Sequence, residues 1–185
     1  PKLSGTTVIA VDTSGSMGSA ISAKNSTCCY EIAMLLGLIA NKICENSIFY
    51  VFDTTIEKYA VSHRSGILDT VMHRARYGGG TGMHLPFQKM IDDKVNADRI
   101  IVLSDNECNG YGWSRPVQTI ADEYRRKSGN DIWVHAIDLQ GYGTQQFHGA
   151  KTNIIAGWSE KVFEFIKLAE QGEGNLERAI EGYTY

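Results

Sequence analysis

Two segments of the chain are almost entirely apolar and rich in β-branched residues. Residues 7–11 read TVIAV and residues 99–103 read RIIVL. Runs of this kind have almost no polar face, so they predict strands that are buried on both sides, as in a parallel sheet. Further strands are predicted at residues 47–52, 57–61 and 132–139, with a short edge strand at 153–156.

Between residues 27 and 44 the apolar side chains recur every three or four positions, which predicts a long helix with one buried face. Because strands and helices alternate along the chain, we predict an α/β fold with a doubly wound, mostly parallel sheet and helices on both of its faces. The shorter helices are predicted at residues 66–73, 84–93, 116–127 and 159–170.

The length and composition fit a single domain that spans residues 1–185. Hydrophobic residues make up 43% of the 185 positions, which is enough for one core. The chain begins at Pro1, only a few residues before the first predicted strand, so we expect a domain excised from a longer protein. No apolar run approaches the length of a bilayer span, and we expect no membrane contact.

The charge balance bears on nucleic-acid binding. The formal net charge is −3, with 18 Lys and Arg against 21 Asp and Glu, and the clearest basic cluster is at residues 125–127. A surface that wraps RNA or DNA needs a basic excess to replace counterions. The composition therefore argues against a large nucleic-acid footprint on this domain alone, although it leaves room for a small contact.

Four cysteines occur, at positions 28, 29, 44 and 108. They contain no CxxC pair, so a zinc knuckle is not predicted. We interpret them as small buried hydrophobic residues plus one loop thiol. The cytoplasm, which keeps thiols reduced, is the expected compartment.

Acidic residues follow both of the apolar strands. Asp12 comes directly after residues 7–11, and Asp105 comes one serine after residues 99–103. A glycine-rich loop at residues 78–82 (GGGTG) precedes a predicted helix. In doubly wound folds ligands bind outside the carboxyl ends of the strands. We therefore expect these three loops to meet at one edge of the sheet.

The three loops can offer five oxygen ligands to one cation. Asp12, Ser14 and Ser16 form a D-x-S-x-S pattern, Thr81 adds a third hydroxyl, and Asp105 adds a second carboxylate. These hard oxygens suit Mg²⁺, Mn²⁺ or Ca²⁺. We predict that the five side chains hold one divalent cation, with Mg²⁺ preferred. For the turn after the first strand, a helix-capping role is the alternative, since Asp and Ser are favoured at N-caps.

The segments VIAVDTSGSM, GGGTG and IIVLSDNE follow one another along the chain. Together they resemble the metal-ion-dependent adhesion site (MIDAS) of von Willebrand factor A domains, which have a Rossmann-like α/β fold. The resemblance implies that Ser14, Ser16 and Thr81 bind the cation through their hydroxyls. It also implies that Asp12 and Asp105 bind the cation directly or through water.

Further motifs resemble one branch of that family. GGGT followed by Leu85-Pro86, then SDNE, then a helix with EYRRK at residues 123–127, is similar to the carboxy-terminal domain of the Ro ribonucleoprotein (TROVE) family. Those proteins pair an A-type domain with an RNA-binding ring of helical repeats, which this chain lacks. The resemblance implies a cytoplasmic protein that associates with small noncoding RNA through the ring.

Specific residues argue against the enzyme families in which an Asp or Ser follows a buried strand. Haloacid-dehalogenase phosphohydrolases need a second Asp two positions after the first, where this chain has Ser14. Residues 14–18 have serine in place of the first glycine of a Gly-x-Ser-x-Gly elbow, and no G-x-x-x-x-G-K-[ST] phosphate loop occurs. We therefore predict a binding module rather than an enzyme, with a Mg-dependent phosphohydrolase as the alternative.

The charge of the predicted site indicates the kind of partner. Two carboxylates neutralise a dication only when both bind it directly, so the ion can attract a further acidic group. We expect that a protein partner or an adjacent domain supplies a carboxylate to the cation. We also expect the domain to be a monomer.

Other residues near the predicted site have competing interpretations. Asp53 also follows a predicted strand, but no neighbouring pattern supports it as a ligand, so we interpret it as a turn residue. His135 lies in an apolar strand and is expected in the core. Tyr111 and Trp113 follow Asp105, where they could anchor an interface or pack beneath the loop.

Overall fold

The sheet contains six strands: β1 (Leu3–Asp12), β4 (Cys44–Phe52), β5 (Ile56–Lys58), β6 (Arg99–Ser104), β7 (Trp133–Asp138) and β8 (Thr152–Ala156). Their order across the sheet is β5-β4-β1-β6-β7-β8. Neighbouring strands run parallel except β5, which is antiparallel to β4. This computed structural model describes residues 2–22, 25–61, 78–105, 116–141, 146–159 and 161–172.

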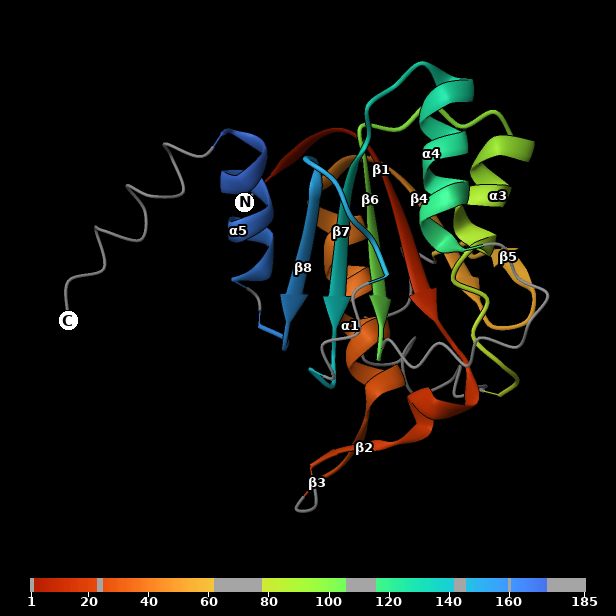
Figure 1. Cartoon of the computed structure of the whole chain (residues 1–185). Helices are drawn as coiled ribbons and strands as arrows, with labels where there is room; N and C mark the ends of the chain where they lie inside the picture. Colours follow the sequence, from red (N-terminus) through yellow and green to blue (C-terminus); the bar gives the residue numbers. More distant parts are fainter. Residues whose placement is uncertain are drawn as a thin grey trace, which may run out of the picture.

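Among the described residues, two helices cover each face of the sheet (Figure 1). On one face lie α1 (Cys29–Ile43) and α5 (Val162–Glu170), and on the other lie α3 (Leu85–Asp92) and α4 (Val117–Ser128). The predicted α/β fold, with a mostly parallel sheet between two helical layers, is confirmed. None of these helices is long and apolar enough to cross a membrane.

Strand β1 contributes to both cores because its side chains alternate between the two faces. Ile9 and Val11 belong to the core beneath α1. Val8 and Ala10 belong to the core beneath α3, and all four side chains are fully buried. Gly37 lets α1 approach the sheet closely, since a Cβ there would lie 2.9 Å from the Val11 side chain. Both faces of β1 are therefore packed in a core, which explains why residues 7–11 form a continuous apolar run.

The start of α1 differs from the prediction by two residues. The chain before it forms a short antiparallel ribbon of β2 (Ala20–Ser22) and β3 (Asn25–Cys28). This ribbon carries no regular alternation of apolar and polar residues, so the sequence does not predict it. The Glu31 carboxylate fixes the start of the helix by accepting a hydrogen bond from the Cys28 N–H at 2.9 Å. In Figure 1 the ribbon projects beyond the carboxyl ends of the strands.

The remaining predicted elements within the described residues are confirmed with shifts of one to three residues at their ends, apart from β1, which begins four residues earlier than predicted. Strand β8 lies at the edge of the sheet, as expected. The helix predicted at residues 66–73 falls outside the described residues.

A buried ion pair attaches α5 to the amino ends of the strands. The Arg99 guanidinium donates to both oxygens of Glu170, with Nε–Oε1 at 2.7 Å and Nη2–Oε2 at 2.8 Å. The Asn153 amide lies 3.2 Å from Nδ1 of His135 and can donate to it, so the ring proton is on Nε2, which lies 3.0 Å from Glu170 Oε1. Burial lowers the pKa of His135, so this ring is neutral at pH 7. His135 is therefore confirmed as a core residue.

We expect Glu170→Ala to lower the free energy of unfolding by about 3 kcal/mol, because it leaves the Arg99 guanidinium, only 5% exposed, without its carboxylate. Urea denaturation at pH 7 measures the change. Glu164→Ala, at an exposed position of the same helix, is the control and should cost about 0.5 kcal/mol or less. Equal losses in the two variants would contradict a structural role for the ion pair.

Candidate metal centre

The carboxyl ends of β1 and β6 lie side by side, because the strands pair in parallel with Val11 opposite Leu103. Asp12 is the last residue of β1, and Asp105 directly follows β6. The arrowheads of β1, β6, β7 and β8 all point to this edge in Figure 1. The structure thus brings the two predicted acids to one edge, where they are 0% and 1% exposed.

Hydrogen bonds hold both carboxylate oxygens of Asp12. The Ser104 hydroxyl donates to Oδ2 at 2.6 Å, and the Ser14 N–H donates to Oδ1 at 2.8 Å. Burial raises the pKa of Asp12 from 3.8 to about 6, because these hydrogen bonds offset only part of the desolvation and the Asp105 carboxylate adds repulsion. Ionised Asp12 is therefore unfavourable in this position, and a bound cation would reverse that.

The two serine hydroxyls of the D-x-S-x-S pattern lie together. Ser14 Oγ is 3.2 Å from Ser16 Oγ. The turn that brings them together is a short 3-10 helix at Gly15–Gly18, which Met17 anchors by its fully buried side chain. Two hydroxyls and one carboxylate are thus gathered within five residues of chain. The helix-capping alternative does not hold for this 3-10 helix, since Ser14 at its N-cap makes no capping hydrogen bond with its side chain.

Backbone hydrogen bonds join the glycine-rich loop to the turn after β1. The Gly15 N–H donates to the Gly79 carbonyl at 3.0 Å, and the Gly78 N–H donates to the Thr13 carbonyl at 2.9 Å. These two bonds fix the glycine-rich loop against the turn that carries the predicted serine ligands. Two of the three loops expected at this edge are therefore in contact, and the third lies outside the described residues beyond Asp105.

Of the five predicted ligands, Thr81 has the least direct contact with the others. Its side chain is half-buried, and among the described residues no hydrogen bond joins its hydroxyl to the other four predicted ligands. Its backbone is well fixed, because the next residue, Gly82, donates to the Asp53 carbonyl at 2.7 Å. A Cβ at Gly82 would lie 2.7 Å from that same oxygen, so the close approach requires glycine.

Two aspartates near the edge serve turns. Asp53 Oδ1 accepts a hydrogen bond from the Thr55 N–H at 2.7 Å, as expected for a turn residue. Asp138 ends β7 opposite Ser104, and its Oδ1 accepts from the N–H groups of Gln140 and Gly141 at 3.1 and 2.9 Å. Both carboxylates thus accept hydrogen bonds from the turns that follow their strands.

Ser104 and Gln140 are two further residues at this edge, and their roles are not predicted from the sequence. Ser104 orients Asp12 directly, and the Gln140 amide donates to Cys29 Sγ at 2.9 Å, at the start of α1. The sequence feature that could have indicated Ser104 is its position at the end of the apolar strand β6, which neighbours β1. No comparable signal marks Gln140, because its partner is 111 positions away.

The cysteines within the described residues, Cys28, Cys29 and Cys44, are buried and free. Burial raises the pKa of Cys29 to about 11, so this thiol is neutral at pH 7. Their interpretation as small buried residues is confirmed. Cys108, Tyr111 and Trp113 fall outside the described residues.

The donor chemistry of this edge fits a hard divalent cation. Within the described part of the chain, no three His, Cys, Asp or Glu side chains are grouped closely enough to hold a metal ion. Among the described residues, a cation here would therefore combine Asp12 and Asp105 with hydroxyl oxygens, which suits Mg²⁺ or Mn²⁺.

Known proteins share both the sequence pattern and the fold. A family model described as the Ro60 vWA domain matches residues 6–166. The RO (RSR) protein of Deinococcus radiodurans superposes with a TM-score of 0.73 and 17% identity over 88% of this chain, which spans only 33% of that protein. No curated protein matches the sequence.

Two further solved structures share the fold. An aerotolerance-related membrane protein from Bacteroides fragilis has a TM-score of 0.54 and 13% identity, over 90% of this chain and 96% of that one. Proximal thread matrix protein 1 from the mussel byssus has a TM-score of 0.53 and 16% identity, over 90% of this chain and 45% of that one.

We expect Asp12→Asn to stabilise the metal-free protein at pH 7 by roughly 2–3 kcal/mol, since raising the pKa from 3.8 to about 6 corresponds to about 1.4 kcal/mol per pH unit. The folded state holds the Asp12 proton more tightly than the unfolded state. Stability from Asp12 is therefore present below pH 3.8 and is lost as the pH rises through about 6.

Urea denaturation in EDTA between pH 4 and pH 8 measures this difference. The wild-type and Asp12→Asn curves should converge near pH 4, diverge as the pH rises to about 6 and differ by a nearly constant amount above it. A constant difference across the whole range would show that ionisation of the buried Asp12 carboxyl does not destabilise the wild-type protein.

Proposed function

This chain belongs to the Ro60 vWA domain family, and from that premise we propose that it is a divalent-metal-dependent binding module. In this proposal one cation, preferably Mg²⁺, is held at the carboxyl edge of the sheet and is presented to an acidic group of a protein partner or adjacent domain. The observation that carries the proposal is the buried Asp12 carboxylate, held in place by Ser14 and Ser104 next to Asp105.

The proposed ligands divide into two chemical groups. The hydroxyls of Ser14, Ser16 and Thr81 would supply neutral oxygens, and Asp12 and Asp105 would supply charge, directly or through water. When bound, the cation would offset the repulsion between the two carboxylates. It would also act as a Lewis acid toward an incoming oxygen ligand.

A carboxylate is the partner group that this electrostatics favours. The site sets at most two negative charges against a dication, and each carboxylate that acts through water leaves part of the charge uncompensated. An aspartate or glutamate from a partner would complete the neutralisation. Neutral oxygen ligands would gain much less, so we propose selectivity for acidic groups.

A metal-dependent phosphohydrolase is the weaker alternative. Such enzymes use a carboxylate nucleophile with a second Asp as acid and base, and Ser14 stands at the second position. Ser14 Oγ contacts Ser16 Oγ, which is no general base, and both Asp12 oxygens already accept hydrogen bonds. We therefore propose that the domain is not an enzyme.

The wider setting follows from the family. The chain spans about a third of the length of the Deinococcus radiodurans RO protein. We propose that the domain acts as a cytoplasmic monomeric unit of a Ro-like protein, with small noncoding RNA held by parts outside this chain.

We expect Mg²⁺ to bind one site and Ser14→Ala to weaken it at least tenfold, because the variant removes a proposed ligand without disturbing a backbone hydrogen bond. Isothermal titration with MgCl₂ after EDTA treatment measures the affinity. Ser19→Ala, an exposed serine of the same turn, is the matched control and should bind like wild type. Equal affinity in Ser14→Ala and wild type would refute the assignment.

The same preparation tests selectivity for acidic ligands. With Mn²⁺ in place of Mg²⁺, acetate should displace bound water and reduce the relaxation enhancement of the solvent protons. Acetamide, which has nearly the same shape and no charge, should have little effect. An equal effect of the two compounds would argue against presentation of the cation to acidic groups.

We expect the chain alone to bind RNA weakly, with a dissociation constant above about 1 μM at physiological salt. Two of the three cations in the basic cluster are already paired: Arg125 with Asp122 at 3.3 Å, and Lys127 with Glu123 at 2.7 Å. Fluorescence anisotropy with a structured small RNA measures the affinity. Submicromolar binding would place the RNA surface within this domain.

A further inference from the structure

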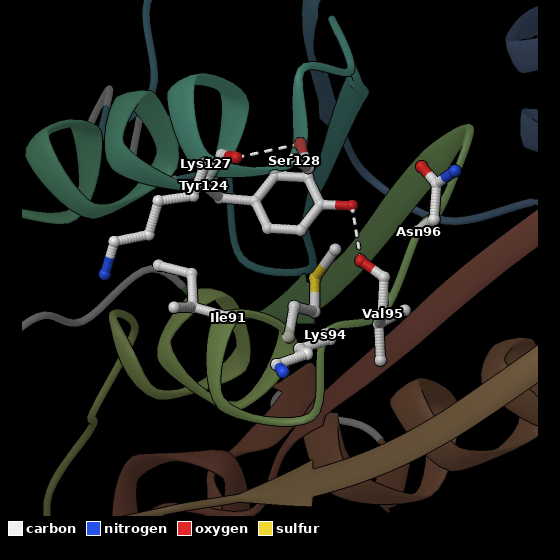
Figure 2. Close-up of a pocket in the computed structure, with 8 residues that line it drawn as sticks. Ile91, Lys94, Val95, Asn96, Tyr124, Lys127 and Ser128 are labelled. Carbon is white, nitrogen blue, oxygen red and sulfur yellow. Dashed lines mark hydrogen bonds between the residues drawn. The ribbon is translucent and has the colours of Figure 1, made fainter.

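A pocket of about 490 Å³ lies between the carboxyl ends of α3 and α4 (Figure 2). Its lining includes Val95 and Asn96, which come just before β6 begins at Arg99. The six residues of β6 span roughly 17 Å, so the pocket and the candidate metal centre lie at opposite edges of the sheet. A volume of this size is typical of sites for small molecules.

The walls of the pocket are apolar and rigid. Met90 and Tyr124 are almost fully buried, and Ile91 and Val95 pack on the same core. The Tyr124 hydroxyl donates to the Val95 carbonyl at 2.9 Å and accepts a hydrogen bond from the Ala97 N–H at 3.1 Å. The buried ring is therefore fixed in place. The partly exposed side chains of Ile91 and Val95, which pack on the same core, form the apolar surface that a ligand can contact.

Lys94 at the rim has an unusual backbone. Its φ is +52°, and it is the only non-glycine residue with a positive φ among those described. It occupies the left-handed position of a Schellman motif, because Val95 N–H donates to the Met90 carbonyl at 2.9 Å and Lys94 N–H donates to the Ile91 carbonyl at 3.2 Å. Glycine would adopt this conformation at a saving of about 1 kcal/mol. A lysine in this strained position is therefore a candidate for a functional role.

Two lysines, Lys94 and Lys127, lie at the rim of the pocket. In the part of the chain that the structure describes, no carboxylate pairs with the exposed Lys94 ammonium, whereas Lys127 pairs with Glu123 at 2.7 Å. In Figure 2 Lys94 lies across the pocket from the Tyr124 ring, and Asn96 lies at the opposite end from Lys127. The pocket thus combines an apolar surface with one available cation at its mouth.

We propose that this pocket binds a small amphipathic carboxylate. The apolar body of the ligand would lie against Ile91 and Val95, and its carboxylate would accept a charge-assisted hydrogen bond from Lys94. The chemistry that selects such a ligand is the juxtaposition of a rigid apolar wall and an unpaired ammonium. This site is separate from the proposed metal centre and does not depend on it.

The test uses 4-phenylbutanoate and its neutral counterpart 4-phenylbutanamide as probes, in EDTA so that no metal contributes. A ligand of this size should bind with a dissociation constant on the order of 1 mM. Titration followed by NMR should shift the methyl signals of Ile91 and Val95, and the carboxylate should bind at least fivefold more tightly than the amide. Failure of both probes to bind at 10-fold higher concentration, roughly 10 mM, would refute the pocket as a site.

Lys94→Gly is the decisive variant, because glycine suits the left-handed position and the fold should not suffer. We expect it to bring the affinity for the carboxylate down to that for the amide, while binding of the amide stays unchanged. Lys167→Met, which removes an exposed cation of α5 on the other face of the sheet, is the charge-matched control and should bind like wild type. If Lys94→Gly keeps the full preference for the carboxylate, the assignment of Lys94 is wrong.

Discussion

The parallel pairing of β1 with β6 is the constraint on which the rest of the structure depends. This pairing sets Asp12 beside Ser104 and allows the hydrogen bond of 2.6 Å between them, although the two residues are 92 positions apart. A shift of one residue would turn every side chain of β1 to the opposite face and would move Asp12 away from its partner. Four buried side chains in two separate cores prevent such a shift, so the packing of β1 fixes the geometry of the candidate site.

The two edges of the sheet treat buried charge in different ways. At the amino edge, burial alone would raise the pKa of Glu170, but hydrogen bonds from His135 and Arg99 and the charge of Arg99 lower it below its usual value. The charge is thus compensated within the protein. At the carboxyl edge, Asp12 receives hydrogen bonds from neutral groups only, and the nearest charge is another carboxylate, so its pKa rises instead. A carboxylate that is held rigidly but left uncompensated is a reason to expect an external cation at this edge rather than at the other.

The sequence predicts most of this architecture because the relevant signals are local. The apolar runs of β1 and β6 could be recognised as buried on both faces, and the stripe of α1 as a packed helix. The ribbon of β2 and β3 could not, since its stability comes from position beside α1 rather than from an alternating pattern. The metal ligands could be proposed because their types and order are distinctive. The support from Ser104 and Gln140 could not, because it arises from contacts between segments far apart in the sequence that only the folded chain brings together.

Helix α3 links the two candidate sites and also keeps them apart. It begins just after the loop that carries Thr81, where Gly82 is bonded to the Asp53 carbonyl, and it ends in the Schellman motif that carries Lys94. Phe87 and Met90 hold the body of the helix in the core with no exposed surface. The helix has eight residues and is roughly 12 Å long. Because one side of it is packed in the core, it is a rigid spacer rather than a hinge. The packed helix therefore holds the two candidate sites at a fixed separation, one at each of its ends.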